Sequence, residues 1–241
     1  MSGAENINRK NYCDGMRDAI PIALGYLAVA FTLGIAARNA GVHALPATIM
    51  SLTNTTSAGE FAAITAIAGG VGYAELALMQ LVINLRYMLM SCALTQKLDP
   101  KFSIIHRFFI GFGVTDEIFG ISVARKGKLN PCYMYGAMSI AIPAWTIGTC
   151  LGVVLGNVLP GGVVSALSVA LYGMFLAIII PPAKDNKVIR GLVIIAMAAS
   201  FLFTKIPVIK NISSGMKVII LTVVISAVAA VLFPLPDEEK E

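Results

Sequence analysis

Charged residues are scarce in this chain. Only 13% of its 241 residues are Asp, Glu, Lys or Arg, whereas 57% are hydrophobic. Soluble domains usually carry about 25% charged residues, so this composition is typical of a polytopic membrane protein. Each helical crossing of a bilayer takes roughly 20 apolar residues, and the length therefore suits one membrane domain with several crossings.

Motifs of common enzymes and metal sites are also missing. The chain has no HExxH, no GxSxG and no Walker loop, and its two histidines, His43 and His106, have no obvious metal-ligating neighbours. We therefore expect no enzymatic activity, no cofactor and no metal. The alternative is an intramembrane enzyme with an unfamiliar set of residues, and substrate turnover by the purified protein would reveal it.

The four cysteines form no close pair and no CxxC motif. Cys13, Cys92, Cys132 and Cys150 are widely spaced, and three of them lie within or beside apolar segments. This pattern predicts buried free thiols rather than a disulfide framework or a zinc site.

The formal net charge of +5 could indicate a nucleic-acid partner, but the basic residues lie in short loops between apolar runs. That distribution favours the positive-inside pattern of membrane proteins and no nucleic-acid binding. The segments expected on the cytoplasmic side are 1–18, 97–107, 125–128 and 184–190.

The apolar runs predict an all-α polytopic membrane protein with about seven transmembrane helices and one or two broken or re-entrant segments. A cytoplasmic arm at 1–18 precedes a single transmembrane domain at 19–235, and residues 236–241 form an acidic solvated tail. Asp18 is interpreted as the cap of the first helix. The expected helices are 19–37, 74–94, 133–155, 163–180, 191–204 and 218–233, with Pro160-Gly161-Gly162 between two of them.

Two apolar segments are interrupted by polar residues. The first, around 46–72, contains the small and hydroxylic stretch 51–59, and the second, 102–124, contains Gly111-Phe112-Gly113 and Thr115-Asp116-Glu117. We expect broken or re-entrant helices that line a site, with an aqueous loop as the alternative for 51–59. The positive-inside rule is satisfied in the first half only if both segments return to their own side, and the basic loop 205–217 then falls outside.

Residues 53–87 are apolar enough for a membrane but carry many polar groups. Hydrocarbon offers these groups no partners, so they must face one another, a cavity or a ligand. This polar strip predicts a transporter working by alternating access. A channel would be expected to show rings of repeated polar residues, and none is visible. The groups are Asn54, Thr55, Thr56, Glu60, Glu75, Gln80, Asn84 and Arg86.

Four short motifs occur in a recognisable order. They are Gly15-Met16-Arg17-Asp18-Ala19-Ile20-Pro21, Ser57-Ala58-Gly59-Glu60-Phe61, Asn84-Leu85-Arg86-Tyr87 and Thr115-Asp116-Glu117. Together they resemble the AzlC-like family, the large subunit of bacterial branched-chain amino-acid exporters, over roughly residues 15–235. The resemblance implies export of valine, isoleucine or leucine across the bacterial cytoplasmic membrane with a small AzlD-like membrane partner. The family motif usually has Gln at the position of Glu60, which leaves the substrate open.

A zwitterionic amino acid needs a receptor for its carboxylate and another for its ammonium group. Arg86 is the only arginine deep within an apolar run, and its planar fork suits a carboxylate. Backbone N–H groups near 57–59 are an alternative receptor. The ammonium group is expected to meet Glu60, Asp116 or Glu117, and neutral hydrogen bonds are expected from Asn54, Gln80 and Asn84.

Neighbouring residues on a helix point about 100° apart, so one of Asp116 and Glu117 is expected to face the site, and Asp116 is favoured. The alternative is that Arg86 and one acid form a structural ion pair. Glu75, near an expected membrane face, is interpreted as structural.

The coupling ion is left open by the sequence. A buried carboxylate is protonated more readily than one in water, which makes Glu60 and Asp116 candidates for proton coupling. Sodium coupling through Asn54, Thr55 and Thr56 is the rival. Two other functions also stay open, namely transport of a different small polar or cationic substrate and a non-transporting assembly subunit. Two halves of roughly 120 residues suggest an internal repeat, without a convincing match between them.

Overall fold

The computed structural model describes residues 3–98, 102–156, 158, 162, 176, 179–180, 183–205 and 214–233. Within these ranges the regular structure is helical apart from one isolated bridge between Leu98 and Leu129, so the all-α class is confirmed. The expected divider at 160–162 and helix at 163–180 lie almost entirely outside the described residues. The loop residues 206–213 and the tail 236–241 lie outside them as well.

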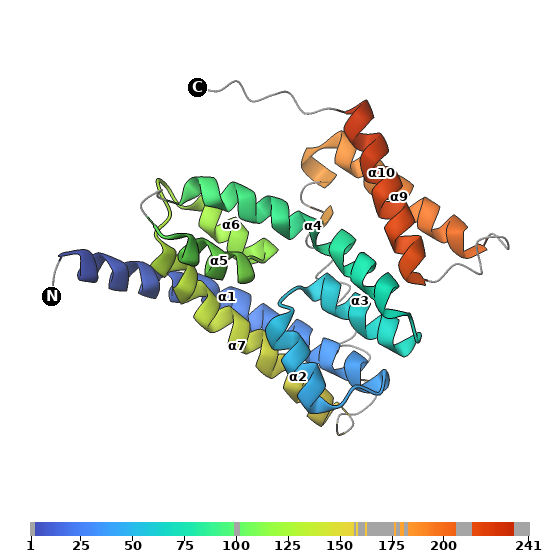
Figure 1. Ribbon diagram of the computed structural model, residues 1–241, viewed down its shortest axis with the longest axis horizontal. Helices are drawn as coiled ribbons and strands as arrows, with labels where there is room; N and C mark the ends of the chain where they lie inside the picture. Colours follow the sequence, from blue (N-terminus) through green and yellow to red (C-terminus); the bar gives the residue numbers. More distant parts are fainter. Residues whose placement is uncertain are drawn as a thin grey trace. The chain divides into compact units, whose positions relative to one another are not determined.

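Figure 1 shows the helices, which largely follow the expected segments. They are α1 (Gly3–Asn39), α2 (Ala44–Thr53), α3 (Ser57–Ala68), α4 (Tyr73–Lys97), α5 (Ile104–Phe112), α6 (Asp116–Ala124), α7 (Pro131–Leu155), α9 (Lys187–Lys205) and α10 (Ser214–Leu232). Among the described residues, three helices are long and apolar enough to cross a membrane: Glu5–Asn39, Tyr73–Lys97 and Pro131–Leu155. The expected count of seven crossings is therefore not confirmed.

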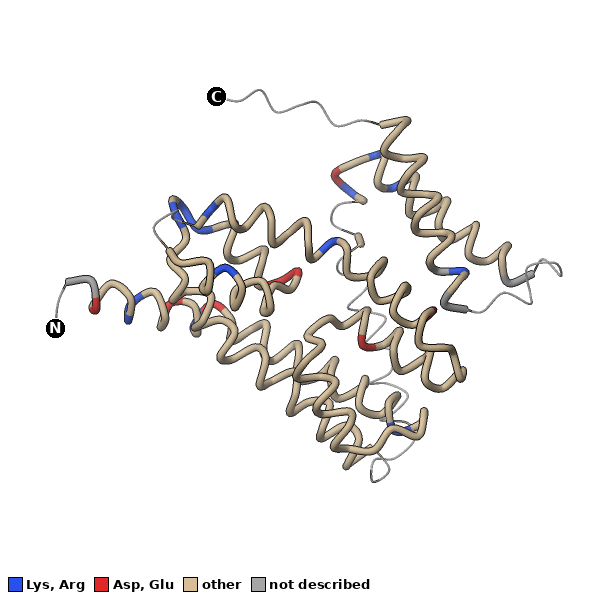
Figure 2. Tube along the Cα trace, viewed as in Figure 1, with Lys and Arg blue, Asp and Glu red and all other residues tan. Residues whose placement is uncertain are grey.

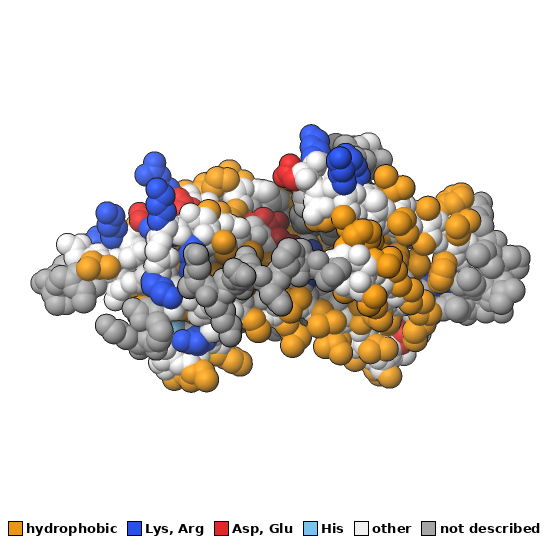
Figure 3. All heavy atoms as spheres, turned by 90° about the horizontal axis from the view of Figure 1, so that it is seen from above, with side chains coloured by type: hydrophobic (Ala, Val, Ile, Leu, Met, Phe, Trp, Pro, Cys, Tyr) orange, Lys and Arg blue, Asp and Glu red, His pale blue; other side chains and the backbone are white. Residues whose placement is uncertain are grey.

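The outward faces of these helices suit lipid. Long stretches of the trace carry no charged residue (Figure 2), and hydrophobic side chains cover much of the face shown in Figure 3. Leu24, Leu89 and Phe108 are 66%, 70% and 80% exposed. Cys13 and Cys92 are exposed and Cys132 and Cys150 half-buried, so the expectation of buried thiols is wrong. Cys13 lies in the polar arm, and the apolar run that carries Cys92 turns part of its surface outward, as a lipid-facing helix must.

The chain forms two compact units. Unit 1 comprises residues 1–64 and 84–171, and unit 2 comprises residues 65–83 and 172–241. In unit 2, α9 and α10 lie side by side (Figure 1), and the Glu75 carboxylate accepts a hydrogen bond from the backbone N–H of Met216 at 3.1 Å. This contact gives Glu75 a structural partner. The groups described below as the candidate site all belong to unit 1.

Unit 1 is built on a parallel pair of helices, α1 and α7, whose backbones touch near both ends. A Cβ added at Gly15 would overlap the Tyr133 carbonyl, and one added at Gly136 would overlap the Tyr12 carbonyl. Farther along, a Cβ at Gly152 would overlap the Phe31 carbonyl. Small residues permit this approach, as in other membrane helix pairs.

The reciprocal contacts make α1 and α7 equivalent members of the pair. Their sequences share Tyr-x-x-Gly at the first contact, followed by Ala19-Ile20-Pro21 in α1 and Ala141-Ile142-Pro143 in α7. The spacing between the two motifs differs by one residue, so the internal repeat stays a prediction.

Helix α1 begins much earlier than the apolar run that predicted it. Its 37 residues would span about 55 Å, well beyond the ~30 Å hydrocarbon core. Asp18 is thus inside the helix, and its interpretation as a helix cap is wrong. Its carboxylate accepts from the Tyr133 hydroxyl at 2.8 Å and lies 3.7 Å from the Arg125 guanidinium. The polar N-terminal residues continue the helix because α7 and α6 supply partners along it.

Each interrupted segment folds as a helix, a short break and a second helix. Between α2 and α3, the break at 54–56 begins where Asn54 leaves helical geometry. Between α5 and α6, the break at 113–115 ends at Thr115, whose hydroxyl caps α6 by accepting from the Ile118 N–H at 3.3 Å. Hydroxyl and amide side chains favour such breaks because they compete for backbone hydrogen bonds.

Side-chain contacts place the start of α5 and the end of α6 near the beginnings of α7 and α1. In α5, the His106 ring lies 2.7 Å from the Tyr135 hydroxyl, near the start of α7. In α6, Arg125 pairs with Asp14 at 3.2 Å, near the start of α1. The break between α5 and α6 instead contacts Tyr26, halfway along α1. This hairpin therefore returns to its own end, as the re-entrant interpretation of 102–124 expected.

Candidate functional site

The two breaks meet beside the middle of α1 and α7. The Thr55 hydroxyl, in the break between α2 and α3, donates to the backbone carbonyl of Phe112 at 3.3 Å, where α5 ends. Two backbone interruptions inside a membrane domain expose polar groups that need partners or line a cavity. Their meeting point is therefore the place to look for a polar ligand.

A small enclosed cavity lies at this junction. Its volume is about 10 Å³, which is room for about one water molecule. Polar groups from both breaks and aromatic rings from three long helices surround it. The lining residues are Tyr26, Thr55, Ser57, Tyr87, Thr115, Glu117 and Trp145.

Glu117 is the acid that lines the cavity. One of its oxygens accepts from the Tyr26 hydroxyl at 2.5 Å, and the same hydroxyl lies 2.7 Å from Thr115 Oγ1. A phenol has one hydrogen to donate, so Thr115 is left to donate toward Tyr26. This network holds a carboxylate at the first turn of α6, where the helix dipole favours negative charge.

Asp116, the acid favoured from the sequence, points elsewhere. It forms an ion pair with Arg86 of α4 at 3.0 Å, which matches the structural alternative for Arg86. The same terminal nitrogen of Arg86 donates to the Tyr87 hydroxyl at 2.9 Å, and the guanidinium lies over the Tyr87 ring. Since Tyr87 lines the cavity, Arg86 stands next to it.

One N–H donor of the Arg86 guanidinium is not used by the described residues. Its Nε is buried and has no hydrogen-bond partner among the described residues. An arginine has five N–H donors in a planar fork, and leaving a buried donor unpaired is costly. A carboxylate approaching from the Nε side would satisfy it, so the site can receive an anion beside Asp116.

Glu60 occupies a separate, fully buried position on α3. It accepts from the Ser51 hydroxyl at 2.7 Å and from the Trp145 indole N–H at 2.8 Å. Ser51 in turn lies 2.6 Å from the Thr149 hydroxyl. The four side chains join α2, α3 and α7 through one continuous polar network, and the Trp145 ring packs edge-on against Tyr26 at 5.3 Å.

The remaining predicted residues divide between the breaks and α4. Asn54 and Thr56 lie in the first break, where the Thr56 hydroxyl donates to the Asn54 side chain at 2.7 Å. Asn84 is two positions before Arg86, which turns its side chain about 200° away on a helix. Gln80 belongs to unit 2, and the cavity as described is made by unit 1 alone.

Three important side chains were missed by sequence reasoning: Tyr26, Trp145 and Thr149. Each lies in a long run without formal charge, and attention to charged groups passed over them. A signal was present, because a phenol, an indole N–H or a hydroxyl in the middle of a membrane helix needs a hydrogen-bond partner.

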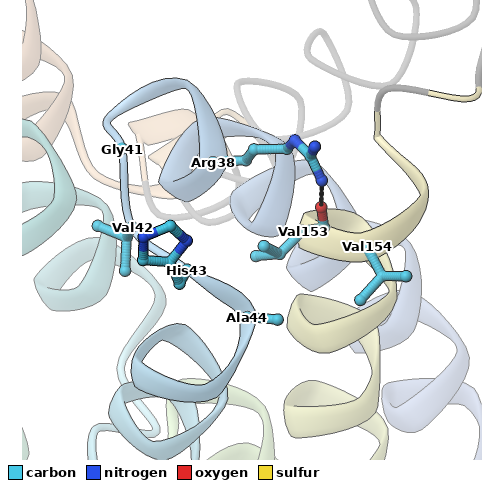
Figure 4. Close-up of a pocket in the computed structure, with 7 residues that line it drawn as sticks. All are labelled: Arg38, Gly41, Val42, His43, Ala44, Val153 and Val154. Atoms are coloured by element: carbon cyan, nitrogen blue, oxygen red, sulfur yellow. Dashed lines mark hydrogen bonds between the residues drawn. The ribbon is translucent and has the colours of Figure 1, made fainter.

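A larger cavity of about 460 Å³ lies at the far end of the α1–α7 pair. Figure 4 shows Arg38 there, with its guanidinium donating to the backbone carbonyl of Val153 at 2.6 Å. An arginine at this position satisfies a carbonyl near the C-terminal end of α7. The described residues that line this cavity include no acid, so the contact is best explained as helix capping.

Comparisons with known proteins identify the family. The sequence model of the AzlC protein family matches residues 21–159, more than half of the chain. This match runs from the middle of α1 to the end of α7 and therefore covers both breaks, Arg86 and Glu60. No solved structure gives a significant match.

Known relatives are membrane proteins. The chain is 33% identical over 176 residues to an uncharacterized membrane protein of Archaeoglobus fulgidus, covering 72% of this chain and 77% of that protein. It is 26% identical over 206 residues to the inner membrane protein YgaZ of Escherichia coli, covering 82% and 84%. An uncharacterized membrane protein of Helicobacter pylori is 25% identical over 152 residues, covering 61% and 65%. The chain is a membrane protein that belongs to the AzlC family.

Proposed function

We propose that this protein is a secondary transporter, not an enzyme, and that it exports branched-chain or related neutral amino acids across the bacterial cytoplasmic membrane. Membership of the AzlC family and the similarity to an inner membrane protein support this proposal. The observation that carries it is the buried, unpaired Nε of Arg86 beside a cavity lined by the acid Glu117. Together they offer both receptors that a zwitterion needs.

The substrate carboxylate binds Arg86 from its Nε side. Asp116 and Tyr87 already hold the Nη2 nitrogen of the guanidinium, so the fork is oriented before the substrate arrives. The substrate carboxylate then adds a charge-assisted hydrogen bond from Nε. Asp116 is then a positioning residue, and removing it would release the guanidinium.

The substrate ammonium group binds the Glu117 carboxylate. The Tyr26 hydroxyl orients that carboxylate through a hydrogen bond of 2.5 Å, and Thr115 Oγ1 lies 2.7 Å from the same hydroxyl. The rings of Tyr26, Tyr87 and Trp145 provide apolar surface around the cavity for an aliphatic side chain. Selection for valine, leucine or isoleucine follows from contact between these rings and a branched aliphatic side chain.

Transport requires the cavity to enlarge, because about 10 Å³ does not admit an amino acid. Among the described residues, a 3.3 Å hydrogen bond from Thr55 to the Phe112 carbonyl links the two breaks. Movement of one hairpin against the α1–α7 pair opens the site to one side, and movement of the other opens it to the opposite side. This is alternating access around a fixed pair of helices.

A small AzlD-like membrane subunit is proposed as the partner, by resemblance to the exporter family. Its contribution is tested by reconstituting the chain with and without it. If the small subunit is required for turnover, exchange appears only in vesicles that contain both chains.

The test of the proposed function is valine counterflow in proteoliposomes, comparing wild type with Arg86→Gln. The substitution removes the carboxylate receptor, and we expect counterflow to fall at least tenfold while insertion and thermal stability persist. Arg17→Gln, which alters an exposed arginine on α1, is the matched control and should keep wild-type exchange. Unchanged exchange in Arg86→Gln would leave Arg86 only its structural ion pair.

Competition distinguishes a neutral from a cationic substrate. In or beside the cavity, the described residues include the acids Glu60, Asp116 and Glu117 and the base Arg86. Because Arg86 neutralises Asp116 and Glu60 lies outside the cavity, we expect unlabelled leucine to inhibit valine counterflow and lysine to have little effect. Stronger inhibition by lysine would replace the neutral substrate with a cationic one.

A further inference from the structure

We propose that Glu60 is the proton-binding site that couples amino-acid export to proton entry. This inference rests on the proposed transport function and adds the coupling ion and the residue that carries it. The substrate cavity uses Glu117 and Arg86, which leaves Glu60 as a buried acid with no part in binding the amino acid.

Among the described residues, Glu60 is buried without a cationic partner. Its side chain is fully inaccessible, and the ion pairs formed by the described residues do not include it. The elements packed against it contribute Ser51 from α2 and Trp145 and Thr149 from α7, all of them neutral. A carboxylate enclosed by neutral donors is costly to keep ionised, so binding a proton is a natural response to this environment.

The hydrogen bonds around Glu60 can serve both protonation states. When the carboxylate is ionised, Thr149 donates to Ser51 and Ser51 donates to Glu60. When Glu60 is protonated, its O–H can donate to Ser51, whose hydroxyl then turns toward Thr149. A hydroxyl both donates and accepts, so this chain reverses without moving a heavy atom, whereas the Trp145 N–H donates in either state. A proton can therefore bind Glu60 and leave it while Glu60 and Ser51 keep their hydrogen bonds.

Protonation at this place changes how the α2–α3 hairpin is held. Glu60 is on α3, its partner Ser51 is on α2, and both are joined to α7 through Trp145 and Thr149. The tip of the same hairpin carries Thr55, which contacts the other break. The charge on Glu60 thus acts on the element that must move to open the site.

The proton site also lies next to the substrate cavity. Trp145 donates to Glu60 and lines the cavity, where its ring packs against Tyr26 at 5.3 Å. The Tyr26 hydroxyl donates to Glu117, the proposed ammonium receptor. Tyr87 accepts from Arg86, and Arg86 pairs with Asp116. The indole ring of Trp145 therefore lies between the substrate cavity and the carboxylate of Glu60.

The charge balance of the cycle is simple. One proton binds the Glu60 carboxylate from the outside and leaves on the cytoplasmic side, while one zwitterionic amino acid moves outward without net charge. Each cycle consequently moves one positive charge inward. An inward proton gradient and an inside-negative potential both drive export.

The chain contains a built-in reporter for this proton. Trp145 is the only tryptophan, and its indole N–H donates to Glu60 at 2.8 Å. We expect the intrinsic fluorescence of the wild type to change with one-proton steepness as the pH is varied. The change should be absent in Glu60→Gln and retained in Glu75→Gln. A titration that persists in Glu60→Gln, or no titration in the wild type, overturns the proposal without reference to any substrate.

Transport measurements separate coupling from substrate binding. Gln keeps an acceptor for Trp145 and a donor for Ser51, so Glu60→Gln imitates the protonated acid. We expect this variant to keep valine counterflow within about threefold of wild type but to lose valine movement driven by a pH gradient, with no proton flux. Glu60→Asp, which restores an acid, should recover part of the proton-driven movement.

The outcomes distinguish this proposal from the proposed function. Loss of valine counterflow in the wild type itself would refute the transport assignment, while the fluorescence titration would still decide whether Glu60 binds a proton. Proton-driven movement that survives in Glu60→Gln would refute the coupling role. Movement driven by a sodium gradient and not by a pH gradient would also refute it, and would return attention to Thr55 and Thr56.

Discussion

The Tyr26 hydroxyl shows how much of the site depends on individual polar atoms. It is held on α1, yet its partners are Thr115 in the break between α5 and α6 and Glu117 in the first turn of α6. The side chain is 8% exposed, so water does not replace a lost partner easily. One atom thereby fixes the acid that is proposed to receive the substrate.

Tyr26→Phe should weaken transport while keeping the ring packing. A hydrogen bond to a charged group contributes about 1.5–3 kcal/mol, so we expect valine counterflow to fall roughly 10- to 100-fold. The same assay on Tyr73→Phe, whose side chain is 92% exposed, is the control and should match wild type. Wild-type exchange in Tyr26→Phe would show that Glu117 needs no orientation by this phenol.

At the residue scale, the sequence was informative about charged groups and less so about neutral ones. Arg86, Glu60 and the adjacent acids stand out because formal charge is rare in this chain. Their partners could not be identified from the sequence, because an ion pair such as Arg86–Asp116 joins residues 30 positions apart through the folding of α4 against α6. Which of two neighbouring acids faces the cavity depends on the rotation of α6, and that is set by packing.

Among the elements, the α1–α7 pair carries the strictest packing requirement. Its backbones touch at Gly15, Gly34, Gly136 and Gly152, and a side chain at any of these positions has no space. Gly25 lies on the same helix α1, yet a Cβ added there would meet nothing within 4 Å. The chain therefore offers a matched pair of glycine substitutions.

Gly152→Ala should lower stability, whereas Gly25→Ala should not. The first places a methyl group against the Phe31 carbonyl and forces the helices apart, at a cost of about 1–3 kcal/mol. The second removes a flexible residue from a helix interior and is expected to be neutral or to stabilise by up to about 1 kcal/mol. Thermal unfolding in detergent compares them, and equal melting temperatures would argue against close α1–α7 packing.

The interrupted helices were the elements best predicted from the sequence. Hydroxylic residues at 51–59 and the Gly and acidic residues at 111–117 mark the breaks, because they favour local side-chain hydrogen bonds and weaken continuous helix. The helical N-terminal arm was not predicted. Its polar residues have no hydrophobic period of their own, and contacts such as Asp18 with Tyr133 become visible only when α7 lies alongside.

For the whole molecule, the contacts of unit 1 imply a definite orientation for its parallel pair. Asn8, Asp14 and Arg125 gather at the beginnings of α1 and α7, and Asn130 donates to Asn8 at 2.9 Å. Arg38 and Val153 mark the opposite ends. The basic residues near the first group predict, by the positive-inside rule, that this end lies in the cytoplasm.

Single cysteines can test this orientation in a background without the four native thiols. Lys126→Cys, at the end of α6, should react with a membrane-impermeant reagent only from the cytoplasmic side. Asn39→Cys, at the end of α1, should react only from outside. Reaction of both from the same side would contradict the parallel crossing of α1 and α7.

By itself, the sequence determined that this is an all-α membrane protein, that two of its segments are interrupted, and that a few intramembrane charges need partners. These conclusions follow from local properties, namely the low charge, the length of the apolar runs and the cost of unpaired polar groups in hydrocarbon. Only the tertiary structure decided that the two breaks meet, that Glu117 lines the cavity while Asp116 pairs with Arg86, and that Glu60 lies against Trp145. Those facts depend on how glycine contacts set the approach of α1 to α7, and such packing joins residues that are distant in the sequence.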